Sequence, residues 1–424
     1  IHAFDDLAIT TMMPAIAEEF NGQHFYGAGF YSYLLASLVS LILAGAYTDQ
    51  RGPQKPFLAG ILVFVAGLLV AAQASSMPVL ILGRALQGFG GGAIQSVVFA
   101  SVNIAYGEDQ RRRAISYLTT AWVLPSLIAP ALAGYVTSQW HWSYVFWGLA
   151  LPALLSGAFV YSRLGALSID TKGGRRIDFS NLPKALRIAC GVAFFLASIS
   201  LVNSYWVIPL SIFSLFIFWR PLLSLFPVDI LQAGQGLSAA LSLKLLLVFT
   251  FFGAEAFIPL VLTDHYQYTA AAAGLVLTSG ALSWTLASWV YDKVAVNFGD
   301  KTLLIIGFSF LGVGVLLLWL FLSVFQWAFM SYFVWSIAAF GMGLVYPMTM
   351  NLAMANTESG KEGKTSTAAG VVDALGFSLA AGIGGAILNI GDRMGYSVFE
   401  AMNGVWLIMA LVSVVALYIS MRRY

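Results

Sequence analysis

Six ionisable side chains lie inside long apolar stretches of the sequence: Asp5, Asp6, Arg84, Lys244, Glu255 and Asp373. A charge at the centre of a lipid bilayer costs about 2.5–3.5 kcal/mol on insertion scales, so residues of this kind are functional candidates there. Carboxyl groups in such positions are typical of proton relays. The set therefore indicates chemistry with protons.

Asp5 has the most informative position of the carboxylates. It precedes Glu18 by thirteen residues, which is about 20 Å along a helix and close to the middle of a membrane. Asp6 is turned about 100° around the same helix, so the two carboxylates are not expected to face one cavity. We favour Asp5 as the proton carrier, with a structural or interfacial carboxylate as the alternative.

The composition requires elements that hold these charges in lipid. Of the 424 residues, 59% are hydrophobic and 9% are charged, whereas roughly a quarter are charged in soluble domains. Most of the outer surface must therefore face the lipid bilayer, and continuous apolar runs favour helices over a barrel.

Several classes of function are excluded by the same composition. The net charge of +2 is too small to suggest nucleic acid, and the single cysteine excludes an intramolecular disulfide. The four histidines are far apart and lack ligand spacing, so we expect no metal site and no cofactor. No nucleophile with a paired base appears, so an enzyme is not expected.

Hydropathy predicts fourteen membrane spans. They lie near residues 1–19, 28–48, 57–76, 78–105, 114–136, 143–163, 184–203, 205–223, 236–262, 271–292, 302–322, 326–354, 365–389 and 400–421. With residue 1 toward the cytoplasm, eighteen Lys and Arg residues fall in inside loops and one in an outside loop. This bias predicts that both termini are cytoplasmic.

A polar stretch divides the chain into two halves. We expect an N-terminal six-helix bundle over residues 1–163, a cytoplasmic linker over 164–183, a two-helix hairpin over 184–223 and a C-terminal six-helix bundle over 224–424. The hairpin carries no ionisable side chain between Arg187 and Arg220, which favours a lipid-facing insert. Removing it leaves six spans on each side, as expected of repeated halves.

The loop from Gly45 to Lys55 resembles the G-x-x-x-D-x-x-G-x-x-[KR] signature of the major facilitator superfamily. Its aspartate can pair with a helix dipole or an arginine and so latch one conformation. An ordinary basic loop on the inner side is the alternative. In the second half, residues 288–292 and 298–301 resemble a degenerate copy of this signature. The residues expected to act in gating here are Gly45, Asp49, Arg51, Gly52, Lys55 and Asp292.

Three further stretches resemble the drug:proton antiporter branch with fourteen spans. Asp5 stands nine residues before Pro14, Arg84 opens an R-x-x-Q-G motif, and residues 129–134 are similar to the G-P-x-x-G-G motif, with alanine at two glycine positions. The resemblance implies that Arg84 faces the first span and tunes Asp5. It also implies gating roles for Pro130 and Gly134.

In the second half, Lys244 and Asp373 lie at equal depth on spans that are neighbours in this family. We expect them to form an ion pair, with Lys244 acting in gating, and a static structural pair is the alternative. Glu255 then faces the central cavity, for a proton or a cationic ligand. The other residues expected to line that cavity are Met12, Met13, Phe252, Trp335 and Tyr346.

The resemblance implies an all-α membrane protein with the major facilitator fold, in which two six-helix bundles with pseudo-two-fold symmetry are joined by a two-helix insert. The function it implies is proton-coupled export of hydrophobic or amphipathic small molecules by alternating access, by a monomer in the bacterial inner membrane. Two alternatives stay open: a proton-coupled importer of a small solute, and a non-transporting membrane sensor or scaffold.

Overall fold

The structure is a computed structural model that describes residues 1–106, 110, 121, 123–165, 177, 179–200, 206–224, 226–227, 230, 234–295, 297–358 and 362–423. Within those residues the regular structure is helical throughout. The helices of the first half and the insert are α1 (His2–Glu19), η1 (Gln23–Phe25), α2 (Tyr26–Arg51), α3 (Gln54–Ala72), α4 (Met77–Ala105), α6 (Val123–Gln139), α7 (Ser143–Leu164), α8 (Leu182–Ile199) and α9 (Val207–Leu223). Those of the second half are α10 (Leu237–Glu255), α11 (Ile258–Asp264), α12 (Ala270–Val294), α13 (Asp300–Trp319), η3 (Leu320–Val324), η4 (Ala328–Met330), α14 (Ser331–Ala355), α15 (Glu362–Arg393) and α16 (Val398–Arg423).

Eleven helical segments of the described chain are long and apolar enough to cross a membrane. Three other predicted spans correspond to α1, which carries four carboxylates, to α9, which has 17 residues, and to α6, of which the structure describes 17. Residues 114–120 and 122 of the span predicted over 114–136 lie outside the described residues. The chain is thus a multi-pass membrane protein.

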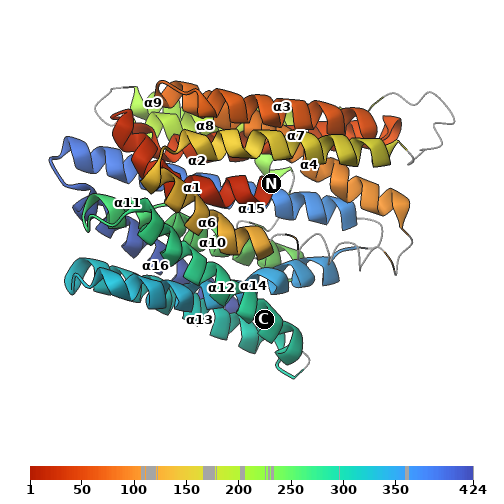
Figure 1. Ribbon diagram of the computed structural model, residues 1–424. Coiled ribbons are helices and arrows are strands. Elements are labelled where there is room, and N and C mark those ends of the chain that lie inside the picture. The colour runs from red at the N-terminus through yellow and green to blue at the C-terminus, as the bar shows by residue number, and fades with distance from the viewer. Residues whose placement is uncertain are drawn as a thin grey trace.

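The helices form two bundles that repeat one packing pattern. In the first half, α2 and α3 pack on α4, α3 packs on α7 and α1 packs on α6. In the second half, α12 and α13 pack on α14, α13 packs on α16 and α10 packs on α15. The same pairs recur in order, which gives the fold its pseudo-two-fold symmetry. In Figure 1, α2, α3, α4 and α7 lie above their counterparts α12, α13, α14 and α16.

The two bundles meet along two helix pairs, α2 with α15 and α6 with α12. Glycine allows the close approach on both seams. A Cβ atom on Gly27 would collide with the backbone of Ala381, and one on Gly134 with that of Ala270. Backbones this close are typical of membrane helices, where small residues replace a hydrophobic driving force.

The predicted hairpin is present as α8 and α9, which pack on each other. Its two helices have different surroundings. On α9, Ile208 and Phe216 are 72% and 76% exposed, as expected of a lipid-facing helix. On α8, Ile188 and Leu196 are fully buried, because α8 lies against both α2 and α15. Phe194 of α8 is 59% exposed, so both helices have an outer face, and the lipid-facing position of the insert stays a prediction.

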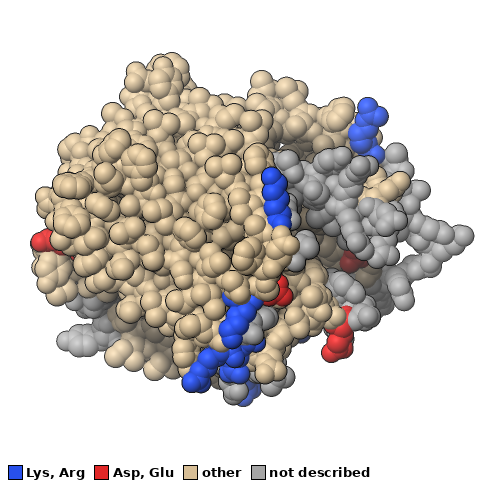
Figure 2. All heavy atoms as spheres, turned by 90° about the horizontal axis from the view of Figure 1, so that it is seen from below, with Lys and Arg blue, Asp and Glu red and all other residues tan. Residues whose placement is uncertain are grey.

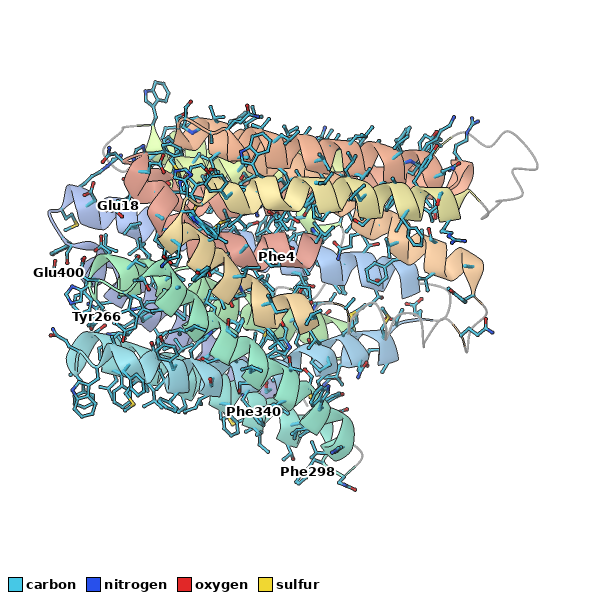
Figure 3. The ribbon with its side chains drawn as sticks, viewed as in Figure 1. Phe4, Glu18, Tyr266, Phe298, Phe340 and Glu400 are labelled. Carbon is cyan, nitrogen blue, oxygen red and sulfur yellow. The ribbon has the colours of Figure 1, made fainter. Side chains whose placement is uncertain are left out.

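The outer surface is apolar over most of its area. Large side chains such as Leu62, Leu155 and Leu411 are more than half exposed on the outside of the bundles. Figure 2 shows the same property: uncharged residues cover most of the visible face, and Lys and Arg side chains are confined to its middle and right. In Figure 3, Glu18, Tyr266 and Glu400 lie at one end of the bundle and Phe298 at the other.

One predicted span is interrupted in the structure. The sequence predicts a continuous helix over residues 236–262, but α10 ends at Glu255 and α11 begins at Ile258, with Pro259 in its first turn. Proline lacks the N–H group that would continue the ladder of helical hydrogen bonds. The hydroxyl of Tyr26 on α2 donates to the carbonyl oxygen of Ala256, which lies between α10 and α11, at 2.9 Å. The break therefore ties the two halves together.

Candidate functional site

A polar cluster from α1 and α4 lies in the apolar interior of the first half. Nη1 of Arg84 donates to Oδ2 of Asp5 and to Oε1 of Gln87, both at 2.7 Å. Nε2 of Gln87 in turn donates to Oδ1 of Asp5 at 3.4 Å. The side chains of Asp5 and Arg84 are 1% and 2% exposed. Two charges can stay this deep because each neutralises the other and both are hydrogen-bonded.

The geometry of this cluster depends on how closely α2 approaches α4. Gly88 lies against the backbone of Tyr33 with no room for a Cβ atom. The approach places the ring of Tyr33 below the guanidinium group of Arg84, with Cζ 4.4 Å from the ring centroid. A cation over an aromatic face is an attractive contact, and more so away from water. Tyr33 therefore holds Arg84 on the side that Asp5 leaves open.

A second ion pair occupies the other half. Nζ of Lys244 on α10 lies 2.9 Å from Oδ1 of Asp373 on α15. The hydroxyl of Tyr346 on α14 donates to Oδ2 of Asp373 at 3.0 Å, and Lys244 Nζ lies 3.7 Å from the centroid of its ring. Lys244 is 2% exposed and Asp373 33%. The pair is therefore open to solvent on one side only.

Glu255 ends α10 at the break in that span. It is 9% exposed, and among the described residues no hydrogen bond or ion pair reaches its carboxylate. A buried acidic group without a partner is costly, so it is a candidate for binding a proton or a cation. No group of three or more His, Cys, Asp or Glu side chains in the described chain could hold a metal ion.

Aromatic rings form a continuous stack beside these charges. Phe251 stacks on Trp335 at 4.7 Å between ring centroids, and Phe252 stacks on Phe377 at 5.1 Å. Trp284 contacts both Phe251 and Phe252 edge-on or tilted, and it also contacts Tyr346. The stack therefore runs from α15 across α10 and α12 to the ring that covers Lys244.

The predicted cavity residues do not share one environment. Phe252 and Tyr346 are half-buried, so they border space that is open in this conformation. Met12, Met13 and Trp335 are fully buried in helix packing, and the indole N–H of Trp335 has no hydrogen-bond partner in the structure. Methionines on α1 therefore fill the packed part of the interior here.

Two of the predicted gating residues lie on the seam between the halves. A Cβ atom on Gly274 of α12 would meet the carbonyl oxygen of Pro130, and one on Gly134 that of Ala270. The motif residues on α6 thus contact α12 directly. Ala129 and Ala133, which stand at glycine positions of the motif, are fully buried, so the helix accommodates both methyl groups.

The charged gating residues predicted in the loop between α2 and α3 are exposed, unlike the gating residues on the seam. Asp49, Arg51 and Lys55 are exposed, and no ion pair joins Asp49 to another described residue. Gly52 has a φ angle of +89°, which glycine adopts without strain, and it ends α2. Gly45 lies beside Ser96 of α4. The side chain of Asp292 lies outside the described residues. A latch at Asp49 is therefore not closed within the described part of the chain.

Comparison with known families gives a match over the whole length. The sequence profile described as Major Facilitator Superfamily matches residues 1–256 and 241–423. The chain belongs to the major facilitator superfamily. It is thus a member of a transporter family.

Relatives of this major facilitator include multidrug transporters. Multidrug resistance protein 3 of Bacillus subtilis is 22% identical over 95% of the chain and 80% of its own length. A probable multidrug-efflux transporter of Mycobacterium tuberculosis is 21% identical over 100% of the chain and 92% of its length. The vacuolar basic amino acid transporter 5 of Saccharomyces cerevisiae is 32% identical, over 41% of the chain and 29% of its own length.

Solved structures support the same fold. The D-xylose-proton symporter has a TM-score of 0.70 at 14% identity and covers 100% of this chain and 94% of its own. A variant of the peptide transporter POT has a TM-score of 0.69 at 15% identity, over 99% and 92% of the two chains. At these identities the likeness concerns the fold alone.

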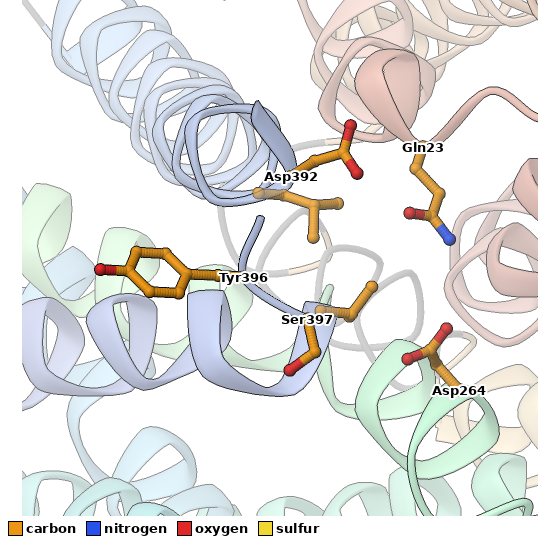
Figure 4. A pocket seen from close by; sticks show the side chains of 7 residues that line it. Gln23, Asp264, Asp392, Tyr396 and Ser397 are labelled. Atoms are coloured by element: carbon orange, nitrogen blue, oxygen red, sulfur yellow. The ribbon is translucent and has the colours of Figure 1, made fainter. Parts of the chain in front are cut away.

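This major facilitator has a separate pocket of about 290 Å³ where η1, α11 and the turn between α15 and α16 meet. Gln23, Asp264 and Asp392 point toward one space, and Tyr396 is turned away from it (Figure 4). None of the predicted site residues lines this pocket. It lies away from the buried ion pairs.

Several residues of the polar clusters were not among the predicted site residues. Gln87 stands in the R-x-x-Q-G motif, and its spacing of three from Arg84 places both on one helix face. His2 could have been found by its spacing of four from Asp6, since the two share a helix face. Tyr33 carries no such signal, because only the contact between α2 and α4 brings it to Arg84.

Proposed function

We propose that the chain is a proton-coupled exporter of hydrophobic or amphipathic small molecules that works by alternating access. The observation that carries this proposal is the buried Asp5–Arg84 pair at 2.7 Å, on two helices of a bundle that otherwise buries apolar residues. An ion pair contributes little net stability at such depth, so a function in proton binding explains its presence better than folding does.

Alternating access is supported by an asymmetry along the bundle. On α1, residues 8–14 are all buried, and Tyr26 hydrogen-bonds across the seam to Ala256. By contrast, Asp373 is 33% exposed, and His2 and Asp6 near the start of α1 are 23% and 25% exposed. We infer that the conformation is closed at the end where α1 finishes and open at the end where it begins.

The coupling follows from charge. A proton on Asp5 removes its negative charge and leaves Arg84 buried with Gln87 and the ring of Tyr33 as its remaining partners. Breaking a buried pair in this way costs about 3–5 kcal/mol, which is enough to shift the balance between two conformations. Asp5 therefore loads a proton in one conformation and releases it in the other, with Arg84 driving the release.

The site for the exported molecule is the aromatic stack with Glu255. Its lining from Phe252, Trp284 and Tyr346 offers flat, adaptable apolar contacts, and Glu255 supplies an acidic group for a proton or a cationic ligand. The multidrug relatives that span nearly the whole chain support a substrate of this kind.

The direction of coupling is tested in proteoliposomes that hold the purified protein and an imposed pH gradient. The probes are ethidium, as a lipophilic cation, and a neutral lipophilic dye. Movement of a probe against the proton flux supports an exporter, and movement with it supports the importer that Ala129 and Ala133 leave open. Transport that is unaffected by the gradient would refute proton coupling, and no transport of any probe would favour a sensor or scaffold.

For the topology we propose fourteen spans, with α1, α6 and α9 crossing the membrane beside the eleven longer segments, and both termini in the cytoplasm of a bacterial cell. We place the bundles at 1–163 and 224–424, with a linker at 164–183 and the insert at 184–223, in a monomer. Reporter fusions after Arg163 and after Arg423 test this, because both are expected inside. A periplasmic signal at either point would contradict the proposal.

A further inference from the structure

A second network joins the Asp5–Arg84 pair through the ring of Tyr33. The hydroxyl group of Tyr33 lies 2.6 Å from Nδ1 of His2, and Nε2 of His2 lies 3.6 Å from Oδ2 of Asp6. The imidazole also stacks on the ring of Tyr33, with 5.9 Å between the ring centroids. The contacts therefore run from Asp6 through His2 and Tyr33 to Arg84.

The helix α4 is shaped to admit this network. A Cβ atom on Gly91 would lie 2.8–3.0 Å from His2 Cε1 and Nδ1 and from the hydroxyl oxygen of Tyr33. Glycine at this position leaves room for the contact between the two rings. Its neighbours Gly88, Gly90 and Gly92 instead serve helix packing against α2 and α3. The glycine run in α4 thus has one member that faces the polar network.

The balance of charge separates the two carboxylates. Asp5 is neutralised by Arg84 at 2.7 Å, so a proton there would break a satisfied buried pair. Asp6 has no Arg or Lys partner among the described residues, and its Oδ1 is buried without a hydrogen bond. A new positive charge nearby would therefore stabilise the carboxylate of Asp6 more than that of Asp5.

Histidine is the side chain whose charge changes between pH 5 and 8 in its unperturbed state. The charged and titratable groups facing His2 are Asp5 and Asp6 from α1, Tyr33 from α2 and Arg84 from α4, with the amino group of Ile1 near both carboxylates. With neutral imidazole and no charge on the nitrogen of Ile1, as in the chain with an N-terminal extension, the two carboxylates and Arg84 sum to one negative charge. One proton on His2 balances the cluster and leaves the Asp5–Arg84 pair intact.

We propose that His2 and Asp6 form a second proton-binding site, coupled to the Asp5–Arg84 pair through Tyr33, and that this site takes up the first proton in the conformation described. The proton comes from water on the open side and binds a ring nitrogen of His2, which gains a positive charge beside Asp6. Both ring nitrogens are then donors, so Tyr33 changes from donor to acceptor at Nδ1. The use of this proton in transport rests on the proposed function, but its binding does not.

The test observes the histidine rings directly and needs no transported probe. The full chain, with an N-terminal extension so that Ile1 has no free amine, is labelled with ¹⁵N-histidine and titrated from pH 5 to 8.5 by NMR. A His2→Asn variant identifies the His2 signals among those of four histidines. We expect His2 to titrate within this range, and Asp6→Asn to lower its proton affinity about ten-fold, since a carboxylate at 3.6 Å is lost.

Two further variants keep the proposal open to refutation if Asp6→Asn does not fold. Tyr33→Phe removes the hydroxyl group and is expected to change the Nδ1 signal of His2. Gly91→Ala crowds the contact and is expected to have a similar effect. His24→Gln, on η1 at the other end of α1, is the matched control and is expected to leave the His2 titration unchanged.

The proposal is overturned if His2 keeps one charge state across the whole range, or if neither Asp6→Asn nor Tyr33→Phe alters its titration. The proposed function can fail independently. If His2 titrates as expected but ethidium movement ignores the pH gradient, the second proton site stands and proton-coupled export does not.

Discussion

Removing either partner of the Lys244–Asp373 pair should destabilise the protein, but by unequal amounts. The two substitutions are Asp373→Asn, which leaves Lys244 charged, and Lys244→Met, which leaves Asp373 charged. Both keep the approximate size of the side chain. The difference between them follows from where each remaining charge lies.

Asp373→Asn is the more damaging change. Lys244 is 2% exposed, and without the carboxylate its ammonium group keeps only the ring of Tyr346 at 3.7 Å and a neutral amide. Breaking a buried pair costs about 3–5 kcal/mol. The cation–π contact with Tyr346 is present in the native protein as well, so it does not reduce this cost. We therefore expect a loss of about 3–5 kcal/mol in the free energy of unfolding.

Lys244→Met should cost about 1 kcal/mol. Asp373 is 33% exposed and keeps its hydrogen bond from Tyr346, so water and that hydroxyl replace the ammonium group. The double variant Lys244→Met with Asp373→Asn removes both charges. Such a replacement is often neutral, so we expect it within about 1 kcal/mol of the native protein.

The assay is SDS-induced unfolding of purified protein in mixed micelles, followed by tryptophan fluorescence. Lys301→Met, at an exposed site at the start of α13, is the matched control for loss of a lysine. Equal losses for the two single variants, or a greater loss for Lys244→Met, would refute the reasoning. A double variant as unstable as Asp373→Asn alone would also contradict it.

Three other predictions concern the seam and the first ion pair. Tyr26→Phe removes the hydrogen bond to Ala256, so it should weaken the closed end by about 1 kcal/mol and raise the labelling rate of cysteines placed there. Gly134→Val should prevent close contact of α6 with α12 and reduce transport at least ten-fold with normal expression, whereas Gly148→Val, where a Cβ atom meets nothing within 4 Å, should not. Gln87→Leu removes one acceptor from Arg84 and should shift the pH dependence of ethidium transport, and an unchanged profile would exclude a role for Gln87.

The fold class could be predicted from the sequence because the bilayer imposes it. Continuous apolar runs with few charges require helices that satisfy their own backbone hydrogen bonds. The position of the break near Glu255 could not be predicted in the same way. Pro259 is visible in the sequence, but membrane helices often tolerate proline, and the hydrogen bond from Tyr26 to Ala256 depends on packing between the halves.

The site could be predicted only as far as spacing and depth allow. Equal depth on two spans suggested the contact of Lys244 with Asp373, which the structure places at 2.9 Å. The roles of Tyr33 and Tyr346 depend on side chains meeting across helices, which sequence spacing does not contain. Met12 is predicted to line the cavity, but it is fully buried. It lies toward the end of α1 that is closed in this conformation, and sequence spacing does not show which end is closed.

The central claim is that protons moving through Asp5 drive transport. The most direct measurement compares two rates in proteoliposomes, ethidium accumulation driven by a pH gradient and ethidium exchange without one, for the native protein and for Asp5→Asn. Asp5→Asn combined with Arg84→Gln serves as the variant without an unpaired buried charge. We predict that, in both variants, the rate of gradient-driven accumulation falls by a factor at least ten times larger than the factor by which the rate of exchange falls. Accumulation that persists at the native rate in a folded Asp5→Asn protein would contradict the claim.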